Sequence, residues 1–122
     1  MESIMNDKKV LIVEDEKITA LFIEHFLSSK GCEIVGSVTN ALDALTTFES
    51  KQPDIVLMDV ILHGEANGIQ CAEQMLSRNL KKLIFITSNS DAKTRESASK
   101  LGDYPYLIKP LDMKKLLDLI QS

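Results

Sequence analysis

The sequence predicts an α/β fold: an open sheet of five parallel strands with helices packed on both faces. Short aliphatic runs without polar interruption, typical of strands buried on both faces, occur along the chain. They alternate strictly with longer segments in which apolar residues recur at helical spacing, an order typical of a parallel sheet. Five strand–helix units are too few to close a barrel of about eight strands, so the sheet is expected to be open.

The first unit illustrates the pattern. Residues 9–14 are expected to form a strand around the aliphatic run at 10–13. Residues 17–29 are expected to form a helix, because apolar side chains recur there at helical spacing before Lys30-Gly31, a typical helix stop. The apolar residues of this helix are Ile18, Leu21, Phe22, Ile23, Phe26 and Leu27. The next strand alternates in part, which indicates an edge, and Asn40 can cap the helix after it. The remaining elements are expected as strand 32–38, helix 41–50, strand 54–59, helix 68–79, strand 83–87, helix 91–101, strand 104–108 and helix 112–121.

A chain of 122 residues and 13.6 kDa has the size of one domain. We expect residues 8–122 to form that domain and residues 1–7 to be a flexible leader. The leader has neither the basic nor the apolar region of a signal peptide, and no apolar stretch approaches the roughly 20 residues that span a bilayer. Neither secretion nor membrane insertion is therefore expected.

The net charge and the cysteines limit which partners and which cellular compartment are expected. A formal net charge of -4 argues against nucleic acid as a direct partner, because duplex binding needs a basic surface. Cys32 and Cys71 are far apart and match no metal-binding spacing, so buried, reduced thiols are expected. These observations predict a cytoplasmic location.

Residues that can carry chemistry follow four of the five aliphatic runs. They are Glu14 and Asp15 after the first run, Asp59 at the end of the third, Thr87 and Ser88 at the end of the fourth, and Lys109 after the fifth. The carboxyl ends of parallel strands lie along one edge of a sheet, where ligands bind near a switch in strand order. Acids, hydroxyl groups and an amine at one edge are the parts of a site for a divalent metal and a phosphoryl group.

Each of these residues also has an ordinary structural reading. An acidic pair can favour the positive end of a helix dipole, a hydroxyl can cap a helix, and Lys109-Pro110 can form a turn. Their common position at one sheet edge favours a shared site over separate structural roles. His25 and His63 are expected to be exposed and have no metal-ligand spacing.

On these motifs, the chain resembles the receiver domain of two-component response regulators over residues 8–121. The motifs occur in the family's order: Glu14-Asp15, Leu57-Met58-Asp59, Gly68, Thr87-Ser88 and Lys109-Pro110. The resemblance implies a flavodoxin-like sheet with the strand order 2-1-3-4-5. It also implies a phosphorelay module that takes a phosphoryl group from a phosphohistidine donor and then changes its affinity for other proteins. No catalysis is implied beyond the formation and loss of its own phosphoryl group.

The resemblance assigns the phosphoacceptor and the metal ligands. Asp59 corresponds to the carboxylate that becomes an acyl phosphate. Glu14, Asp15, Asp59 and the backbone carbonyl of Ile61 correspond to the ligands of a magnesium ion, for which manganese is an alternative. Magnesium suits such a site because it favours carboxylates, water and phosphate. Lys109 corresponds to the lysine that pairs with Asp59 and then with the phosphoryl group.

The resemblance also implies a conformational switch. Thr87, which shares its motif with Ser88, corresponds to the hydroxyl that binds a phosphoryl oxygen. Tyr106 corresponds to an aromatic residue whose rotamer follows Thr87. The bond between Lys109 and Pro110 is typically cis in the family. A phosphoryl group would thus bias a bistable element next to the site.

The implied partners are proteins. The donor is a sensor histidine kinase or a histidine phosphotransfer protein, which docks on the first helix, including Thr19 and Glu24. A downstream protein or a second copy of the chain binds the face made by the fourth helix, the fifth strand and the fifth helix. That face carries both charge signs, which suits a reversible interface: Lys93, Arg95, Lys100, Asp112, Lys114 and Lys115.

The sequence departs from the family pattern at several positions. Asn67 stands where an aspartate is common, in a loop that lacks the usual proline and is one residue longer. Ile61 is apolar where many relatives are polar, and with Asn89 it flanks the path of an attacking water, so slow hydrolysis is expected. Pro105 removes a backbone donor from the last strand and can restrict the switch.

Three other functions remain open from the residues. The chain can be a degenerate receiver that binds proteins without phosphorylation. It can be a phosphohydrolase with an aspartate nucleophile, although such enzymes need a second acid where Ile61 stands. It can be a flavin-binding module, although the acids of Glu14-Asp15-Glu16 would repel the phosphate that such proteins bind after the first strand.

Overall fold

The computed structural model describes residues 8–63, 67–88 and 92–122. Its strands are β1 (Lys9–Val13), β2 (Glu33–Val38), β3 (Ile55–Asp59), β4 (Lys82–Thr87) and β5 (Tyr106–Ile108). Its helices are α1 (Lys17–Ser29), α2 (Ala41–Lys51), α3 (Gly68–Leu76), α4 (Ala92–Ser99) and α5 (Met113–Gln121). Strands and helices alternate throughout, as the sequence predicts.

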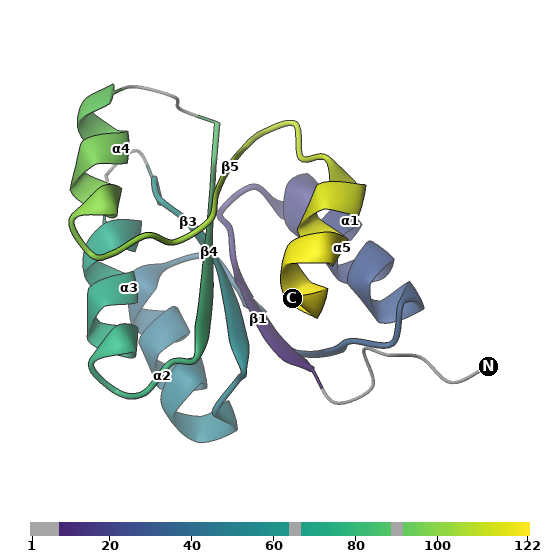
Figure 1. The fold of residues 1–122 in the computed structure, drawn as a ribbon. Coiled ribbons are helices and arrows are strands. Elements are labelled where there is room, and N and C mark those ends of the chain that lie inside the picture. The colour runs from purple at the N-terminus through teal and green to yellow at the C-terminus, as the bar shows by residue number, and fades with distance from the viewer. Residues whose placement is uncertain (1–7, 64–66, 89–91) are drawn as a thin grey trace.

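The strands form one parallel sheet in the order β2-β1-β3-β4-β5, which confirms the predicted fold and strand order. Figure 1 shows α1 and α5 on one face of the sheet and α2, α3 and α4 on the other. The partly alternating strand β2 lies at an edge, as expected. The chain changes direction across the sheet after β2, so the switch in strand order lies between β1 and β3.

Two hydrophobic cores lie on opposite faces of the sheet, because successive residues of a strand point to opposite sides. In β3, Val56 and Met58 belong to the core under α2, α3 and α4, whereas Leu57 belongs to the core under α1 and α5. β3 is buried along its whole length, which explains its unbroken aliphatic sequence. Cys71 and Cys32 are free, buried thiols, one in each core, as predicted.

Helix ends follow the signals in the sequence. The Asn40 side chain accepts a hydrogen bond from the Asp43 N–H (2.8 Å) and caps α2. Asp112 caps α5 in the same way, accepting from the Lys115 N–H (3.1 Å). α1 is followed by Gly31 with a φ of 95°, a conformation that glycine adopts without steric cost.

The last strand is shorter than predicted. The sequence predicts a strand at 104–108, whereas β5 begins at Tyr106. Pro105 has no N–H to donate, although its carbonyl oxygen accepts a hydrogen bond from the Phe85 N–H (2.9 Å). The prediction of strand at the first two of these positions was therefore wrong.

Three helices also differ from the prediction, among them the helix predicted at 91–101, which ends at Ser99. The helix predicted at 68–79 ends at Leu76, because the chain then turns and reaches Asn79 with a positive φ of 71°. Three apolar positions of α1 are exposed rather than buried: Ile18 (85%), Leu21 (63%) and Phe22 (61%). α1 therefore presents an apolar surface to solvent, and its buried positions include Ala20, which the apolar pattern did not single out.

Some predictions fall outside the described residues, namely the leader at 1–7, Asn89 and the start of the fourth helix at residue 91. Among the residues that the structure does describe, no helix combines the length and the apolar character needed to cross a bilayer. Both histidines are exposed, as predicted.

Candidate phosphoryl and metal site

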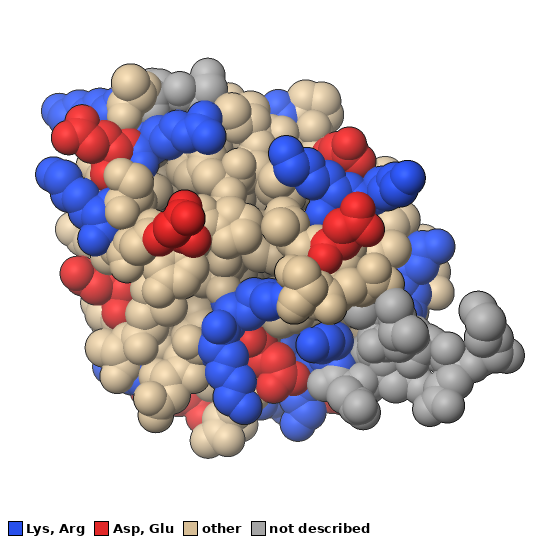
Figure 2. Space-filling view, viewed as in Figure 1, with Lys and Arg blue, Asp and Glu red and all other residues tan. Residues whose placement is uncertain are grey.

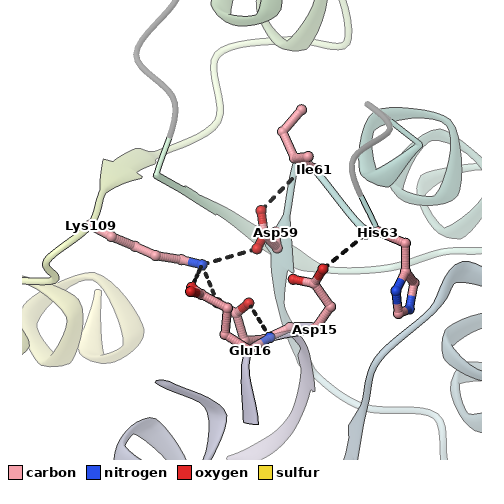
Figure 3. A network of polar contacts seen from close by, with 7 residues as sticks. Asp15, Glu16, Asp59, Ile61, His63 and Lys109 are labelled. Carbon is pink, nitrogen blue, oxygen red and sulfur yellow. Dashed lines mark hydrogen bonds and ion pairs between the residues drawn. The ribbon is translucent and has the colours of Figure 1, made fainter. Parts of the chain in front are cut away.

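The carboxyl ends of the strands bring the predicted site residues to one edge of the sheet, and Figure 3 shows Asp15, Asp59 and Lys109 among them. Asp59 at the end of β3 is paired in the ladder with Ile86 of β4. Thr87 follows and is paired with Ile108 of β5, directly before Lys109. β1 is the other neighbour of β3, so the acids that follow β1 lie beside Asp59. The register of four parallel strands thus assembles the site.

Asp59 is a buried acid with only 3% of its surface exposed. Its Oδ1 atom accepts a hydrogen bond from the Ile61 N–H (3.0 Å), and its Oδ2 atom accepts one from the Lys109 ammonium (3.0 Å). The backbone donor and the cation together fix the plane of the carboxylate. A carboxylate held in one orientation beside a cation is suited to attack an anionic group.

Lys109 reaches from the end of β5 into the acidic cluster (Figure 3). Its ammonium forms ion pairs with Glu14, with Asp59 (3.0 Å) and with Glu16 (3.0 Å). Burial disfavours the charged ammonium, but these three carboxylates outweigh that effect and hold the pKa of Lys109 above its usual value. Lys109 therefore stays positively charged at any pH at which the protein would function.

Glu14 is completely buried. Its Oε2 atom accepts a hydrogen bond from the Glu16 N–H (3.0 Å), and its Oε1 atom forms the ion pair with the Lys109 ammonium. Burial raises the pKa of Glu14 from 4.5 to about 7, and the contact with Lys109 offsets only part of that rise. The site thus holds more acid than Lys109 neutralises.

The acidic cluster fits a divalent cation. Glu14, Asp15 and Asp59 each offer a carboxylate oxygen, and these atoms lie within 4.8 Å of one another. Asp15 is oriented by a hydrogen bond from the His63 N–H (2.9 Å). Three carboxylate oxygens this close together suit a hard ion such as Mg²⁺, which prefers oxygen ligands. The residues present therefore agree with the expected cofactor.

Thr87 and Ser88 lie at the same edge, at the end of β4. Thr87 is fully buried and Ser88 is exposed. The carbonyl oxygen of Thr87 accepts a hydrogen bond from the Lys109 N–H (2.7 Å), so the backbones that carry the hydroxyl and the lysine are tied together. The bond between Lys109 and Pro110 is cis, as the resemblance implies.

Tyr106 lies half-buried on β5, between the sheet and α4. Its ring centroid is 6.2 Å from that of Phe85 on β4. The guanidinium of Arg95 on α4 lies over the ring, 5.2 Å from its centroid, a distance typical of a cation–π contact. The predicted switch residue therefore connects β5 to α4.

Glu16 is a residue of this cluster for which the sequence predicted no role at the site. Its carboxylate contacts Lys109 although the two residues are 93 positions apart. The available signal in the sequence is that Glu16 directly follows the acidic pair at the start of α1.

The raised pKa of Glu14 predicts an unusual dependence of stability on pH. Between pH 4.5 and about 7 the folded protein binds more protons than the unfolded chain, so the free energy of unfolding falls as the pH rises through this window. Without divalent cations, the expected loss is of the order of 1–3 kcal/mol. Denaturant unfolding in a chelator at several pH values measures it.

The variant Glu14→Gln should flatten this part of the profile, whereas Glu73→Gln, which changes an exposed acid on α3, should leave it unchanged. A slope that persists in Glu14→Gln would assign the effect to another group.

Comparison with known proteins relates the chain to one family. A family model described as the response regulator receiver domain matches residues 10–121. The chain is 31% identical over 114 residues to the transcriptional regulatory protein PdtaR of Mycobacterium tuberculosis, which covers 93% of this chain and 55% of that protein. It is 27% identical over 117 residues to the chemotaxis protein CheY of Thermotoga maritima, covering 94% and 96%. The chain thus spans about half the length of PdtaR and nearly all of that CheY.

A solved structure gives the same relation. The signal receiver domain of a modulated diguanylate cyclase from Desulfovibrio desulfuricans G20 superposes with a TM-score of 0.84 at 32% sequence identity. The match covers 93% of this chain and 90% of that one. The likeness in structure thus extends over nearly the whole of both chains.

Proposed function

The chain belongs to the family of response regulator receiver domains, and we propose that it accepts a phosphoryl group on Asp59 and thereby changes its affinity for other proteins. The observation that carries the proposal is the Asp59 carboxylate, which is buried, paired with Lys109 and close to the carboxylates of Glu14 and Asp15. In the same proposal, residues 8–122 form the receiver domain and act in the cytoplasm. The protein catalyses only the formation and loss of its own phosphoryl group.

The transfer is a displacement at phosphorus. One carboxylate oxygen of Asp59 forms a bond to the phosphorus atom, the bond between phosphorus and the donor breaks, and the donor leaves with the electron pair. Such a reaction is catalysed mainly by alignment and by neutralising charge on the phosphoryl oxygens. Lys109 supplies positive charge within hydrogen-bond distance of Asp59. The Ile61 N–H holds the carboxylate in place for the attack.

Glu14, Asp15, Asp59 and the carbonyl of Ile61 would hold the magnesium ion in this proposal, and manganese is an alternative. The bound ion supplies positive charge that offsets the charge of the phosphoryl group. The ion is needed because the cluster contains more carboxylates than the single positive charge of Lys109 can neutralise, and phosphorylation adds further negative charge.

The switch in this proposal runs from Thr87 to Tyr106. The Thr87 hydroxyl binds a phosphoryl oxygen, and Tyr106 changes its position in response, with Ser88 and the Lys109-Pro110 turn lining the same edge. The contact between Arg95 and the Tyr106 ring supports this part of the proposal, because a movement of the ring would alter the link between β5 and α4. A change at Asp59 would thus reach an exposed face.

The phosphoryl donor is a sensor histidine kinase or a histidine phosphotransfer protein, and we place its docking surface on α1. Exposed apolar side chains there are Ile18, Leu21 and Phe22, whereas the predicted Thr19 and Glu24 are half-buried. Ile18, Thr19 and Phe22 line a pocket of about 260 Å³ together with Lys109. The donor protein must bind next to Lys109 for its phosphoryl group to reach Asp59, so an apolar surface at that place can serve as its docking site.

The target is a downstream protein or a second copy of the chain, and it binds the face of α4, β5 and α5. Figure 2 shows basic and acidic side chains interspersed over this face, with uncharged surface between them. A surface that mixes both signs suits an interface that forms and dissociates. The six charged residues predicted for this face are all exposed: Lys93, Arg95, Lys100, Asp112, Lys114 and Lys115.

Ile61 is expected to prolong the phosphorylated state. It follows Asp59 closely and offers no polar side chain to orient an attacking water, so Ile61→Asn should shorten the lifetime of the acyl phosphate by about one order of magnitude. Decay of the phosphorylated mass after removal of the donor measures this lifetime. Ile61→Val keeps the apolar character and should decay like the native protein. A native lifetime of seconds that Ile61→Asn does not change would refute this role.

The proposed function is tested by intact mass after incubation with acetyl phosphate. One added phosphoryl group is expected in the presence of magnesium and none in the presence of a chelator. Failure of the native chain to take up a phosphoryl group with magnesium present would reject the proposal and leave a degenerate receiver that binds proteins without phosphorylation.

A further inference from the structure

Glu16 occupies the helix N-cap position of α1, where the short side chains of Ser, Thr, Asp and Asn ordinarily accept a hydrogen bond from a backbone N–H of the first turn. Within the described residues, its side chain makes no such capping bond. Its Oε1 atom instead lies 3.0 Å from the Lys109 ammonium. The carboxylate is therefore directed at the site lysine rather than at its own helix.

The Lys109 ammonium has three N–H donors, and three carboxylates contact it: Glu14, Glu16 and Asp59. A phosphoryl oxygen bound to Asp59 would need one of these donors. Lys109 can supply it only by leaving one of its present partners, so the three partners compete with the phosphoryl group.

The partners differ in how easily they can be released. The Glu14 side chain is fully buried and that of Asp59 is 4% exposed, so neither is readily rehydrated after losing its cation. The Glu16 side chain is 61% exposed and can rotate toward solvent, where water hydrates its carboxylate. Glu16 is therefore the partner whose release costs least.

We propose that Glu16 is a positioning residue that accepts a hydrogen bond from one N–H group of the Lys109 ammonium in the unphosphorylated protein and releases that N–H group to the phosphoryl group. The inference rests on the proposed function, because it concerns the same transfer to Asp59. Glu16 touches neither the donor nor the phosphoryl group and acts through Lys109. Its carboxylate favours the unphosphorylated state and slows the attack of Asp59, since Lys109 must exchange partners as the new bond to phosphorus forms.

The test compares the rate of phosphorylation of the native protein, Glu16→Gln and Glu73→Gln by intact mass, with magnesium present. Glu16→Gln should raise the rate constant about two- to fivefold, the range that a partly exposed ion pair is worth. Glu73→Gln removes the same charge from an exposed position on α3 and should match the native protein. Acetyl phosphate and phosphoramidate, which carries less negative charge, are used in parallel.

The two phosphoryl donors distinguish competition for the Lys109 ammonium from electrostatic repulsion between Glu16 and an anionic phosphoryl donor. An increase by a similar factor with both donors supports the inference, because the exchange of Lys109 does not depend on the charge of the donor. An increase confined to acetyl phosphate would overturn it, since that result would show simple repulsion by Glu16. Equal rates for the native protein and Glu16→Gln would overturn it as well. If the native protein itself takes up no phosphoryl group, it is the proposed function that fails.

Discussion

Asp59→Asn is expected to lower the rate of phosphoryl uptake by at least about three orders of magnitude. The amide of asparagine is a poor nucleophile, although it has nearly the same shape as the carboxylate and can still accept the hydrogen bond from the Ile61 N–H. The substitution also removes one negative charge from a cluster with more acid than Lys109 neutralises, so the fold should remain at least as stable.

The matched control is Asp54→Asn, directly before the same strand. The Asp54 carboxylate accepts a hydrogen bond from the Lys9 N–H (3.0 Å) at the opposite end of the sheet, and an asparagine can keep that bond. Intact mass at several times of incubation with acetyl phosphate should show uptake by Asp54→Asn and none by Asp59→Asn. Normal uptake by Asp59→Asn would mean that another residue is the acceptor.

Gly68→Ala is expected to disrupt the site through the backbone. A Cβ atom at position 68 would overlap the carbonyl oxygen of Asp59 and lie 2.9 Å from the Cα atom of Val60. Both neighbours are backbone atoms, which cannot rotate away as a side chain can. The start of α3 would have to move off the end of β3, and the free energy of unfolding should fall by the order of 3 kcal/mol. Phosphorylation should slow as well, because the displaced backbone carries Asp59.

Gly36→Ala is the control for this effect. Its Cβ atom would lie 2.8 Å from a side-chain methyl group of Thr47, which can shift, so the expected cost is about 1 kcal/mol. Denaturant unfolding of both variants measures the difference. Equal costs for the two substitutions would show that the close approach at Gly68 is not a constraint on the fold.

Much of the fold could be predicted from local patterns. Unbroken aliphatic runs identify β1, β3 and β4 because these strands are buried on both faces. The pattern failed where tertiary structure decides, as in α1: Ile18 and Phe22 repeat at helical spacing but lie outside the area that the sheet covers. It also failed at residues 104 and 105, where apolar and aromatic character favours a strand but Pro105 has no N–H for the ladder.

The common edge of the site residues could be predicted because parallel strands end on the same side, so Asp59 and Lys109 had to lie at one edge once the sheet was recognised. The strand order itself came from the family resemblance, since periodicity does not determine which strands are neighbours. The contact between Glu16 and Lys109 could not be predicted, because it depends on a side-chain rotamer at the end of α1 and on a partner 93 residues away.

Chemical trapping of the modified residue tests the central claim most directly. The protein is incubated with acetyl phosphate and magnesium and then treated with borohydride, which reduces an acyl phosphate to an alcohol and so converts an aspartyl phosphate to homoserine. Tandem mass spectrometry of the peptides should find homoserine at position 59, and only in the sample that received the phosphoryl donor. Homoserine at a different position, or an intact Asp59 in a protein that carries the phosphoryl group, would contradict the account.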